Sequence, residues 1–327
     1  MYRIRWTRVL ALSAALGALV LLLRGCAIAC GAGGADAAPR VKALPGATVR
    51  VYDAQAGGVE ERLLEEYLVG VVAAEMPASF HEQALRAQAV AARTYTAYRA
   101  AHGGCGAHDG ADVCTSSACC QAYATDAALR ARWGADYAQN LARVEAAVYE
   151  TAGEVLLYGG APIEALYHSA SGGYTEDSEN VFANAVPYLR AVESPDEVGT
   201  SHLTGSVRYA RAELCALVNA ALPEAALSPD ALEDQVEILE RSRSGRVQRL
   251  RLGGAALTGR EARGLLGLDS ALFTIAFDED GVRFDTRGFG HGVGMSQTGA
   301  NAMGLAGSDY RQILLHYYTG ASLGPLP

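Results

Sequence analysis

The sequence predicts an α+β fold, a single mixed helix/strand domain, behind an N-terminal membrane anchor. Of the 327 residues, 50% are apolar and 19% are charged, which is enough apolar surface for a large buried core. Helical and strand-like patterns alternate from residue 48 to the C-terminus, with no internal repeat and no long linker. We therefore expect one domain over residues 48–327.

Several segments of this domain have helical patterns. Apolar residues recur at helical spacing from Leu64, and Pro77 ends that helix near Glu75, because the residue before a proline disfavours helical geometry. Ser79 is the expected N-cap of the next helix, which is rich in alanine and free of glycine. The later helices are expected over residues 81–101, 136–151 and 210–220, near Ser296 and around 310–318.

Strands are expected where short apolar or alternating runs border turn residues. Gly159-Gly160 joins the strands expected over 155–158 and 163–168. Ser242–Gly245 forms the turn of one hairpin, and an acidic turn between 277 and 282 forms the turn of a second hairpin. Residues 102–120 and 169–185 have neither period and are expected to be loops. The predicted strands cover residues 48–52, 155–158, 163–168, 236–239, 247–252, 273–277 and 282–285.

The N-terminal residues indicate where the domain works. Arg3, Arg5 and Arg8 precede an apolar run over 9–29, a pattern that holds the N-terminus in the cytoplasm and sends the rest outside. A cleaved signal peptide is the alternative, since Ala27-Ile28-Ala29 is a small-x-small cleavage pattern. We expect a single-pass protein of the cell membrane with a cytoplasmic N-terminus (1–8), a transmembrane signal anchor (9–29), a flexible linker (30–47) and an extracytoplasmic domain (48–327).

Charge and missing motifs narrow the class of protein. With 36 acidic and 27 basic side chains the net charge is −9, so nucleic acid is not an expected partner. The GxSxG and HExxH motifs are absent, which argues against a serine hydrolase of that type and against a zincin peptidase.

Glu75 is the strongest candidate for a catalytic residue. It follows Val71 by four positions and Val72 by three, so it shares the apolar face of its helix. A carboxyl group at the buried C-terminal end of a helix loses hydration and faces the negative end of the dipole, and both effects raise its pKa. Such a group is suited to donate a proton. The alternative is a carboxylate paired with Arg86 or Arg93 of the next helix.

The loop over residues 105–120 has two interpretations. His108, Cys114 and Cys120, with Cys105 and Cys119 beside them, offer the imidazole and thiolate ligands that zinc prefers. Outside the membrane, disulfide pairing among the four cysteines is equally sensible.

Two polar segments could bind sugar. Residues 168–176 contain His168, Ser169, Ser171 and Glu176 at the end of a predicted strand, and residues 288–297 place four glycines around His291. Hydroxyl groups can hydrogen-bond sugars, and glycines let the backbone approach a ligand closely. Turn formation alone, or packing under a neighbouring helix, is the alternative for each segment.

Taken together, these segments resemble the stage II sporulation protein D (SpoIID) family and its SpoIID/LytB domain. The resemblance runs in family order from about residue 48 to the C-terminus. Thr298 stands where the family usually has tyrosine, and Cys119 adds a thiol beside Cys120. The matching segments are Glu66-Tyr-Leu-Val-Gly-Val-Val-Ala-Ala-Glu-Met-Pro77, residues 84–95, 168–176, 187–195 and 242–246, and Gly290-His-Gly-Val-Gly-Met-Ser-Gln297.

The resemblance implies a membrane-anchored lytic transglycosylase that cuts peptidoglycan glycan strands, preferably strands stripped of stem peptides. It implies work in sporulation, during engulfment, with a cell-wall amidase and membrane partners. Glu75 would be the catalytic acid, and zinc would be favoured over disulfides at His108, Cys114 and Cys120. The alternatives are a zinc amidase and a non-catalytic glycan-binding partner that recruits an amidase. The expected substrate-binding residues are Arg93, His168, Ser169, Ser171, Gly172, Glu176, His291 and Gln297.

Overall fold

The computed structural model describes residues 46–195 and 203–327, which belong to one compact unit of mixed helices and strands. The mixed single-domain prediction is confirmed at this level. The predicted cytoplasmic N-terminus, the anchor and nearly all of the predicted linker lie outside the described residues. Within the described ranges, no helix combines the length and the hydrophobicity that a membrane crossing needs.

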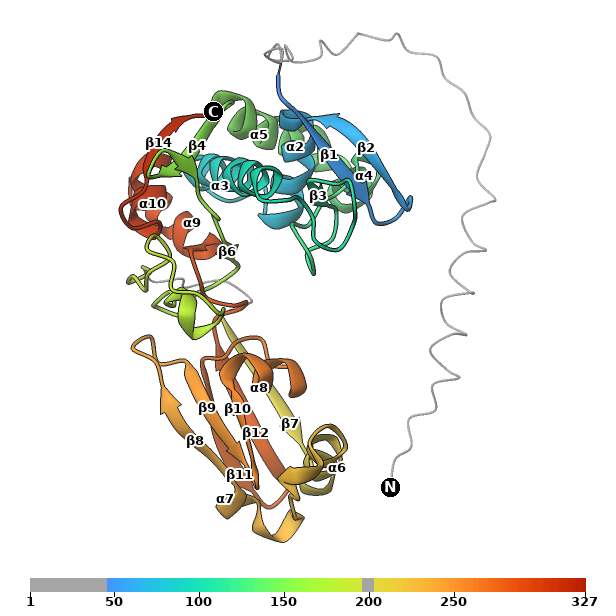
Figure 1. The fold of residues 1–327 in the computed structure, drawn as a ribbon, viewed down its shortest axis with the longest axis vertical. Coiled ribbons are helices and arrows are strands. Elements are labelled where there is room, and N and C mark those ends of the chain that lie inside the picture. Colours follow the sequence, from blue (N-terminus) through green and yellow to red (C-terminus); the bar gives the residue numbers. More distant parts are fainter. Residues whose placement is uncertain (1–45, 196–202) are drawn as a thin grey trace, which may run out of the picture. The chain divides into compact units, whose positions relative to one another are not determined.

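A long alanine-rich helix, α3, organises the first hydrophobic core (Figure 1). Its residues Ala84, Ala87, Ala91 and Ala92 are fully buried, and such small side chains let neighbouring helices approach closely. The helices in contact with α3 (Glu82–Ala101) are α2 (Leu64–Glu75), α5 (Tyr137–Glu150), α9 (Gln297–Leu305) and α10 (Tyr310–Tyr317).

The ends of α2 and α3 fix the segment that carries Glu75. As expected from Pro77, α2 ends at Glu75, and the Met76 backbone is extended. The predicted cap at Ser79 is wrong: a turn closed by the hydrogen bond from the Phe80 amide to the Pro77 carbonyl moves the N-cap two residues later, to His81. His81 is the N-cap of α3, and its ring accepts a hydrogen bond from the Gln83 amide.

A small sheet precedes these helices. The predicted opening strand is β1 (Thr48–Asp53), which pairs antiparallel with β2 (Gly58–Leu63) and parallel with β3 (Val113–Cys114). The sequence pattern does not reveal β2, because its side chains are almost all exposed. The β3 pairing places Cys114 opposite Tyr52 and so fixes the cysteine-containing loop to the domain.

The middle of the chain differs from the prediction. Residues 163–168 do not form one strand: β5 (Ala161–Pro162) pairs with β4 (Glu154–Tyr158), and β6 (Tyr167–His168) pairs in parallel with the remote β13 (Met295–Ser296). The helix α4 (Asp126–Trp133) was not predicted. It buries only Leu129, so its apolar periodicity is weak.

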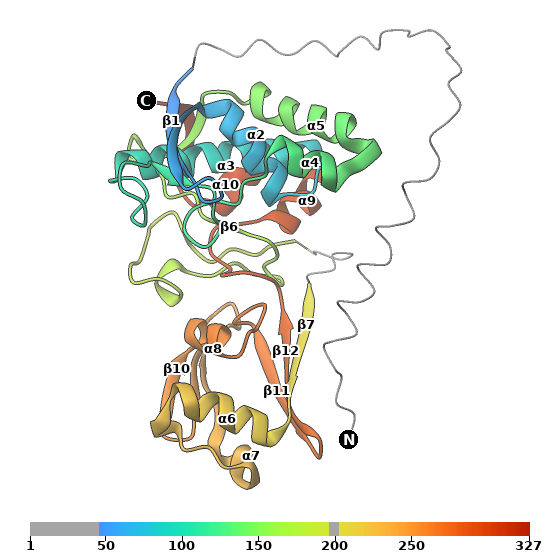
Figure 2. The same ribbon diagram turned by 90° about the vertical axis from the view of Figure 1, so that its right-hand side faces the viewer.

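A second hydrophobic core lies between two three-stranded sheets and their helices (Figure 2). Both predicted hairpins are confirmed. One sheet has the order β11-β12-β7, from β11 (Phe273–Asp278), β12 (Gly281–Arg287) and β7 (Thr204–Tyr209). The other sheet has the order β10-β9-β8, from β8 (Val236–Arg241), β9 (Val247–Leu252) and β10 (Ala255–Thr258). The helices of this region are α6 (Arg211–Ala221), α7 (Leu232–Gln235) and α8 (Gly259–Leu265).

The last strand, β14 (Ser322–Pro325), returns to the first part of the fold, where it pairs with β4.

Candidate active site

A cavity of about 670 Å³ opens at the C-terminal end of α2, and Glu75 is part of its wall. The wall is built by segments that are far apart in the sequence: the end of α2, the end of α4, the start of α5, the residue after β6 and the start of α9. Its polar and aromatic lining residues are Glu75, Ser79, Phe80, Arg132, Trp133, Asn140, Ser169, Gln297 and Thr298.

The surroundings of Glu75 favour its protonated form. Burial raises the pKa of this carboxyl above its ordinary value of 4.5, while the hydrogen bonds from the Ala122 amide and the Gln297 side chain, and the nearby Tyr167 hydroxyl, act in the opposite direction. The Ala122 amide nitrogen lies 2.6 Å from Glu75 Oε1. The net effect is a raised pKa in a group that is half-buried at a cavity wall.

The salt-bridged alternative for Glu75 is wrong. Arg86 pairs with Glu82 and Glu150, and the Arg93 guanidinium lies 2.6 Å from a carboxylate oxygen of Glu65. Both arginines are therefore occupied with other carboxylates, and neither neutralises Glu75.

Arg93 holds the fold together and does not bind substrate, which corrects its predicted role. Its side chain is fully buried. Besides the two hydrogen bonds to Glu65, its guanidinium donates to the carbonyl groups of Val148 and Glu154, at 3.0 and 3.1 Å. A guanidinium saturated in this way has no face left for a sugar.

Strand pairing brings Ser169 and Gln297 to the cavity. Because β6 and β13 pair in parallel, the residues that follow them leave the sheet at the same end. Ser296 is the N-cap of α9 and accepts a hydrogen bond from the Gly299 amide, so Gln297 is the first residue of the helix, which begins where the sequence predicts. The amide and the hydroxyl of Thr298 both donate to the Ser169 carbonyl at 3.0 Å, which ties the two segments together.

The other predicted sugar-binding residues do not line this cavity. His168 is buried, its ring centroid lies 5.5 Å from that of His291, and burial lowers its pKa far below the usual value. Ser171 and Glu176 are fully buried, and Glu176 accepts hydrogen bonds from the side chains of Ser242, Ser244 and Asn180. Gly172 has a φ of +78°, so this glycine forms a turn within the same loop.

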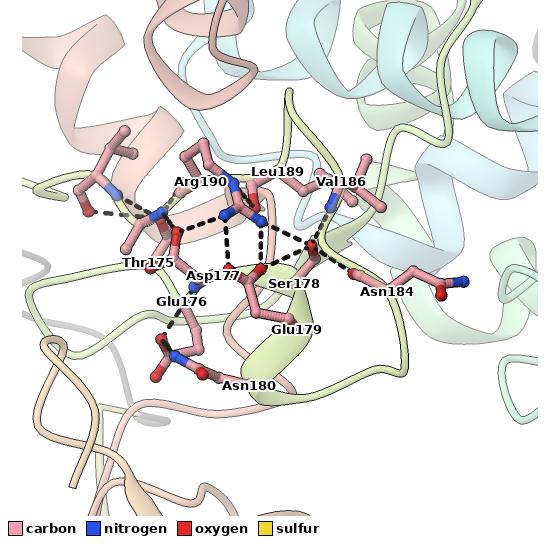
Figure 3. Close-up of polar contacts among 12 residues, drawn as sticks. Thr175, Glu176, Asp177, Ser178, Glu179, Asn180, Asn184, Val186, Leu189 and Arg190 are labelled. Carbon is pink, nitrogen blue, oxygen red and sulfur yellow. Dashed lines mark hydrogen bonds and ion pairs between the residues drawn. The ribbon is translucent and has the colours of Figure 1, made fainter.

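The loop after β6 is ordered by Arg190 (Figure 3). The Arg190 guanidinium forms an ion pair with Glu179 and donates to the Ser178 hydroxyl at 2.9 Å, while its Nε donates to the Leu189 carbonyl. The Asp177 carboxylate accepts from the Ala191 amide at 2.9 Å. The segment over residues 169–185, predicted to be a loop, is a loop whose conformation is fixed by these contacts.

Four sulfur atoms meet in the loop between α3 and α4. Cys105, Cys114, Cys119 and Cys120 place their Sγ atoms within 4.8 Å of one another; the Cys105–Cys119 distance is 3.2 Å, and the Cys105–Cys120 and Cys119–Cys120 distances are both 3.7 Å. A tetrahedral zinc ion with Zn–S bonds of about 2.3 Å requires sulfur separations of about 3.8 Å, so this donor set fits zinc. His108 is outside the group, since its ring stacks on Tyr52, and this corrects the predicted ligand set.

The sequence did not point to several residues that surround Glu75 or line its cavity. Tyr167 donates to Gln121 Oε1 at 2.8 Å, and Gln121 in turn donates to Thr96, so the segment that follows Cys120 is fixed beside Glu75. The position of Ala122, two residues after Cys120, was the available signal. Trp133 lies at the end of α4, a helix that was not predicted.

Comparisons with known proteins agree on one family. The sequence profile of the family described as SpoIID, stage II sporulation protein, matches residues 52–158. Stage II sporulation protein D of Bacillus amyloliquefaciens is 36% identical over 288 residues, which cover 88% of this chain and 81% of that protein. Stage II sporulation protein D of Bacillus subtilis (strain 168) is 35% identical over 286 residues, covering 88% of this chain and 81% of that protein. A Bacillus subtilis protein named amidase enhancer is 29% identical over 303 residues, 78% of this chain and 40% of that protein.

Proposed function

The chain belongs to the stage II sporulation protein D family, and on that basis we propose that it is a peptidoglycan lytic transglycosylase that cuts denuded glycan strands during sporulation. The observation that carries the proposal is the position of Glu75. This carboxyl lies in a cavity wall, has a raised pKa and has no arginine partner among the described ion pairs.

One carboxyl group is enough for this chemistry. Glu75 protonates the oxygen that leaves C1 of the muramic acid, and the C1–O bond to the next glucosamine breaks. The C6 hydroxyl of the same muramic acid attacks C1 and closes a 1,6-anhydro ring. Its proton passes to the Glu75 carboxylate, which restores the acid. Hydrolytic glycosidases usually need a second carboxylate, because they must activate water or form a covalent intermediate.

The rest of the cavity can hold the sugar rings. Trp133 offers an aromatic face for stacking against a pyranose, and Ser169, Asn140 and Gln297 offer hydrogen-bonding groups. Gln297 also hydrogen-bonds Glu75, so we assign it a role in positioning the acid as well as the substrate.

We assign zinc, held by the four cysteines, a structural role. A bound zinc ion would cross-link the loop between α3 and α4 through its thiolates. That loop continues into Gln121 and Ala122, which contact Tyr167 and Glu75. The cysteine cluster would thus hold the amide that hydrogen-bonds the catalytic carboxyl.

The sequence also supports a location and partners for the proposed enzyme. We place the protein in the cell membrane as a single-pass protein, with the catalytic domain outside, because of the arginines and the apolar run over residues 9–29. Its substrate would be supplied by a cell-wall amidase that strips stem peptides, within an engulfment complex. The name of the relative called amidase enhancer supports the association with an amidase.

That name also favours a second candidate function. In this alternative, the protein binds glycan without cutting it and recruits or activates an amidase. The cavity would then be a binding groove, and the raised pKa of Glu75 would have no catalytic use.

The products formed from denuded glycan separate the candidates. Purified protein should release chains that end in 1,6-anhydro-muramic acid, which mass spectrometry detects as a loss of water relative to a hydrolysed end. Binding without any new chain ends, with or without an added amidase, would instead favour the recruiting partner. Release of free peptides from intact peptidoglycan would indicate amidase activity.

A further inference from the structure

A second cavity, of about 200 Å³, has a lining rich in arginine. It contains Arg246, Arg260 and Arg263 together with His291, and no aspartate or glutamate lines it. A small cavity lined in this way has a positive electrostatic potential. The proposed cleavage at Glu75 uses none of these arginines.

Two of the arginines have donors available for a ligand. Arg260 lies over the Phe182 ring and donates to the Val181 carbonyl at 3.3 Å, and Arg263 donates through Nε to the Leu268 carbonyl at 3.2 Å. Within residues 46–195 and 203–327, neither arginine forms an ion pair. Since each guanidinium carries five N–H donors, most of their donors remain for an anion.

The nearby carboxylates leave the cavity positive. Glu261 is adjacent to Arg260 in the sequence, and Asp269 interacts electrostatically with Arg263. Neither acid lines the cavity. Glu176 is buried, and its carboxylate is occupied with Ser242, Ser244 and Asn180 (Figure 3 shows the bond to Asn180).

Arg246 forms a fixed wall of the cavity. It is buried and donates to the carbonyl groups of Tyr174 and Ser171, at 2.8 and 2.6 Å. Gly292 packs directly against it with φ +84°, and a Cβ atom at that position would lie 2.6 Å from the guanidinium carbon. The glycine-rich segment is therefore needed to fit around this arginine. Burial and the three arginines lower the pKa of His291 to about 4, so the imidazole is neutral.

The two cavities are close neighbours. Ser169 lines the cavity of Glu75, and the adjacent His168 packs its ring 5.5 Å from His291, which lines the arginine cavity. The chain segment of His168 and Ser169 thus contacts the lining of both cavities, so a glycan strand with one muramic acid at Glu75 could place another at the second cavity.

We propose that the arginine cavity binds the lactyl carboxylate of a muramic acid located away from the bond that is cut. This inference rests on the proposed function, since it assumes a glycan substrate. Removing a stem peptide from muramic acid leaves a free carboxylate on the lactyl group. Arginine recognises a carboxylate through charge-assisted hydrogen bonds. An attached peptide converts this group into a neutral amide and adds a chain too large for a cavity of about 200 Å³. The cavity would thus select denuded strands.

Binding to an inactivated protein tests the proposal without any turnover. We would measure the affinity of the full chain carrying Glu75→Gln for fluorescent denuded glycan, alone and with Arg260→Gln plus Arg263→Gln. The double change should weaken binding by about tenfold or more, as expected for the loss of charged hydrogen bonds. Arg249→Gln, an exposed arginine of β9, is the matched control and should leave the affinity unchanged.

Chemical variants of the glycan complete the test. Glycan whose carboxyls have been converted to methyl amides should bind the parent and the double variant equally, and inorganic phosphate should compete only weakly. Equal affinity of both proteins for unmodified glycan would overturn the proposal. Arg260→Gln alone, at an exposed residue, provides a smaller loss if the double variant does not fold.

The outcome is independent of the cleavage assay. Loss of affinity in the double variant, with no anhydro ends formed by the unmodified protein, would support the carboxylate site and contradict the transglycosylase. If proteins with and without the two arginines form anhydro ends equally fast at glycan concentrations below KM, the transglycosylase is supported and the carboxylate site is contradicted.

Discussion

At the scale of single residues, the spacing of the sequence located Glu75 but not its partners. Its distance from Val71 and Val72 placed it on the apolar face of α2, and Pro77 placed it at the helix end. Ala122, Tyr167 and Gln297 come from three other segments, and no local pattern reveals contacts across such separations. The same limit explains the wrong role given to Arg93, whose buried partners lie in remote elements.

The raised pKa of Glu75 predicts a pH dependence of catalysis. The rate requires the protonated carboxyl, so kcat/KM on denuded glycan should fall as the pH rises through the pKa of the folded protein, which lies above 4.5. A pH–rate profile checks this. A rate that instead rises along with deprotonation of Glu75 would show that the group acts only as a base.

The same shift predicts a pH dependence of stability. Because the folded pKa is raised, the contribution of the carboxyl to stability is complete below the unfolded pKa and is lost as the pH rises through the folded pKa. The free energy of unfolding of the unmodified protein, minus that of Glu75→Gln, should therefore decrease from acidic to neutral pH. Urea unfolding at several pH values measures the difference, and a constant difference would contradict the shift.

At the scale of elements, long periodic helices and hairpins could be predicted, whereas short strands could not. The sequence gives the end of α2, most of α3 and both late hairpins, because each has its pattern within one segment. β6 and β13 consist of two residues each and exist only because they pair with one another across more than a hundred positions. β2 and α4 are largely exposed, so burial leaves little periodicity in their sequences.

Arg93 connects α3 with α2 and β4, and its removal should destabilise the domain. Arg93→Met leaves Glu65 without its partner, and removing one member of a buried ion pair typically costs about 3–5 kcal/mol. Urea unfolding should show a loss of that order. Arg86→Met, which breaks more exposed pairs, should cost less than about 1 kcal/mol. Equal losses in the two variants would contradict the role of Arg93.

The cysteine cluster should hold one zinc ion per chain and support the active site through the loop. Cys114→Ser should lower the metal content, the melting temperature and the rate on denuded glycan together. Elemental analysis and thermal unfolding measure the first two effects. Cys215→Ser, at a cysteine buried in the second core and outside the cluster, is the control and should keep the metal. Unmodified protein with two disulfides and no metal would contradict the proposal.

At the scale of the whole molecule, the sequence predicted one mixed domain but not its internal division. The first core is rich in alanine and the second in leucine, but both are built from apolar side chains of several segments, so no local pattern marks the division between them. The two polar segments were predicted to shape one sugar cleft, but the fold distributes them between two cavities. Ser169 and Gln297 line the cavity of Glu75, whereas His291 lines the arginine cavity.

The compact unit should work without the proposed anchor. A chain that begins at residue 46 retains both cores, so it should cleave dissolved denuded glycan at an unchanged rate and lose its association with membranes. Fractionation of cells, combined with the cleavage assay, checks both effects. Equal recovery of both forms in the membrane fraction would contradict the anchor over residues 9–29.

The central claim is that the Glu75 carboxyl carries the proton that breaks the glycan. The most direct measurement is the release of 1,6-anhydro-muramic acid ends from denuded glycan by Glu75→Gln, with Glu82→Gln, an exposed glutamate of the neighbouring α3, as the matched control. We predict a loss of about 10²–10⁴-fold in rate for Glu75→Gln, with unchanged folding, and a normal rate for the control. Anhydro ends released at the unmodified rate by a folded Glu75→Gln protein would contradict it.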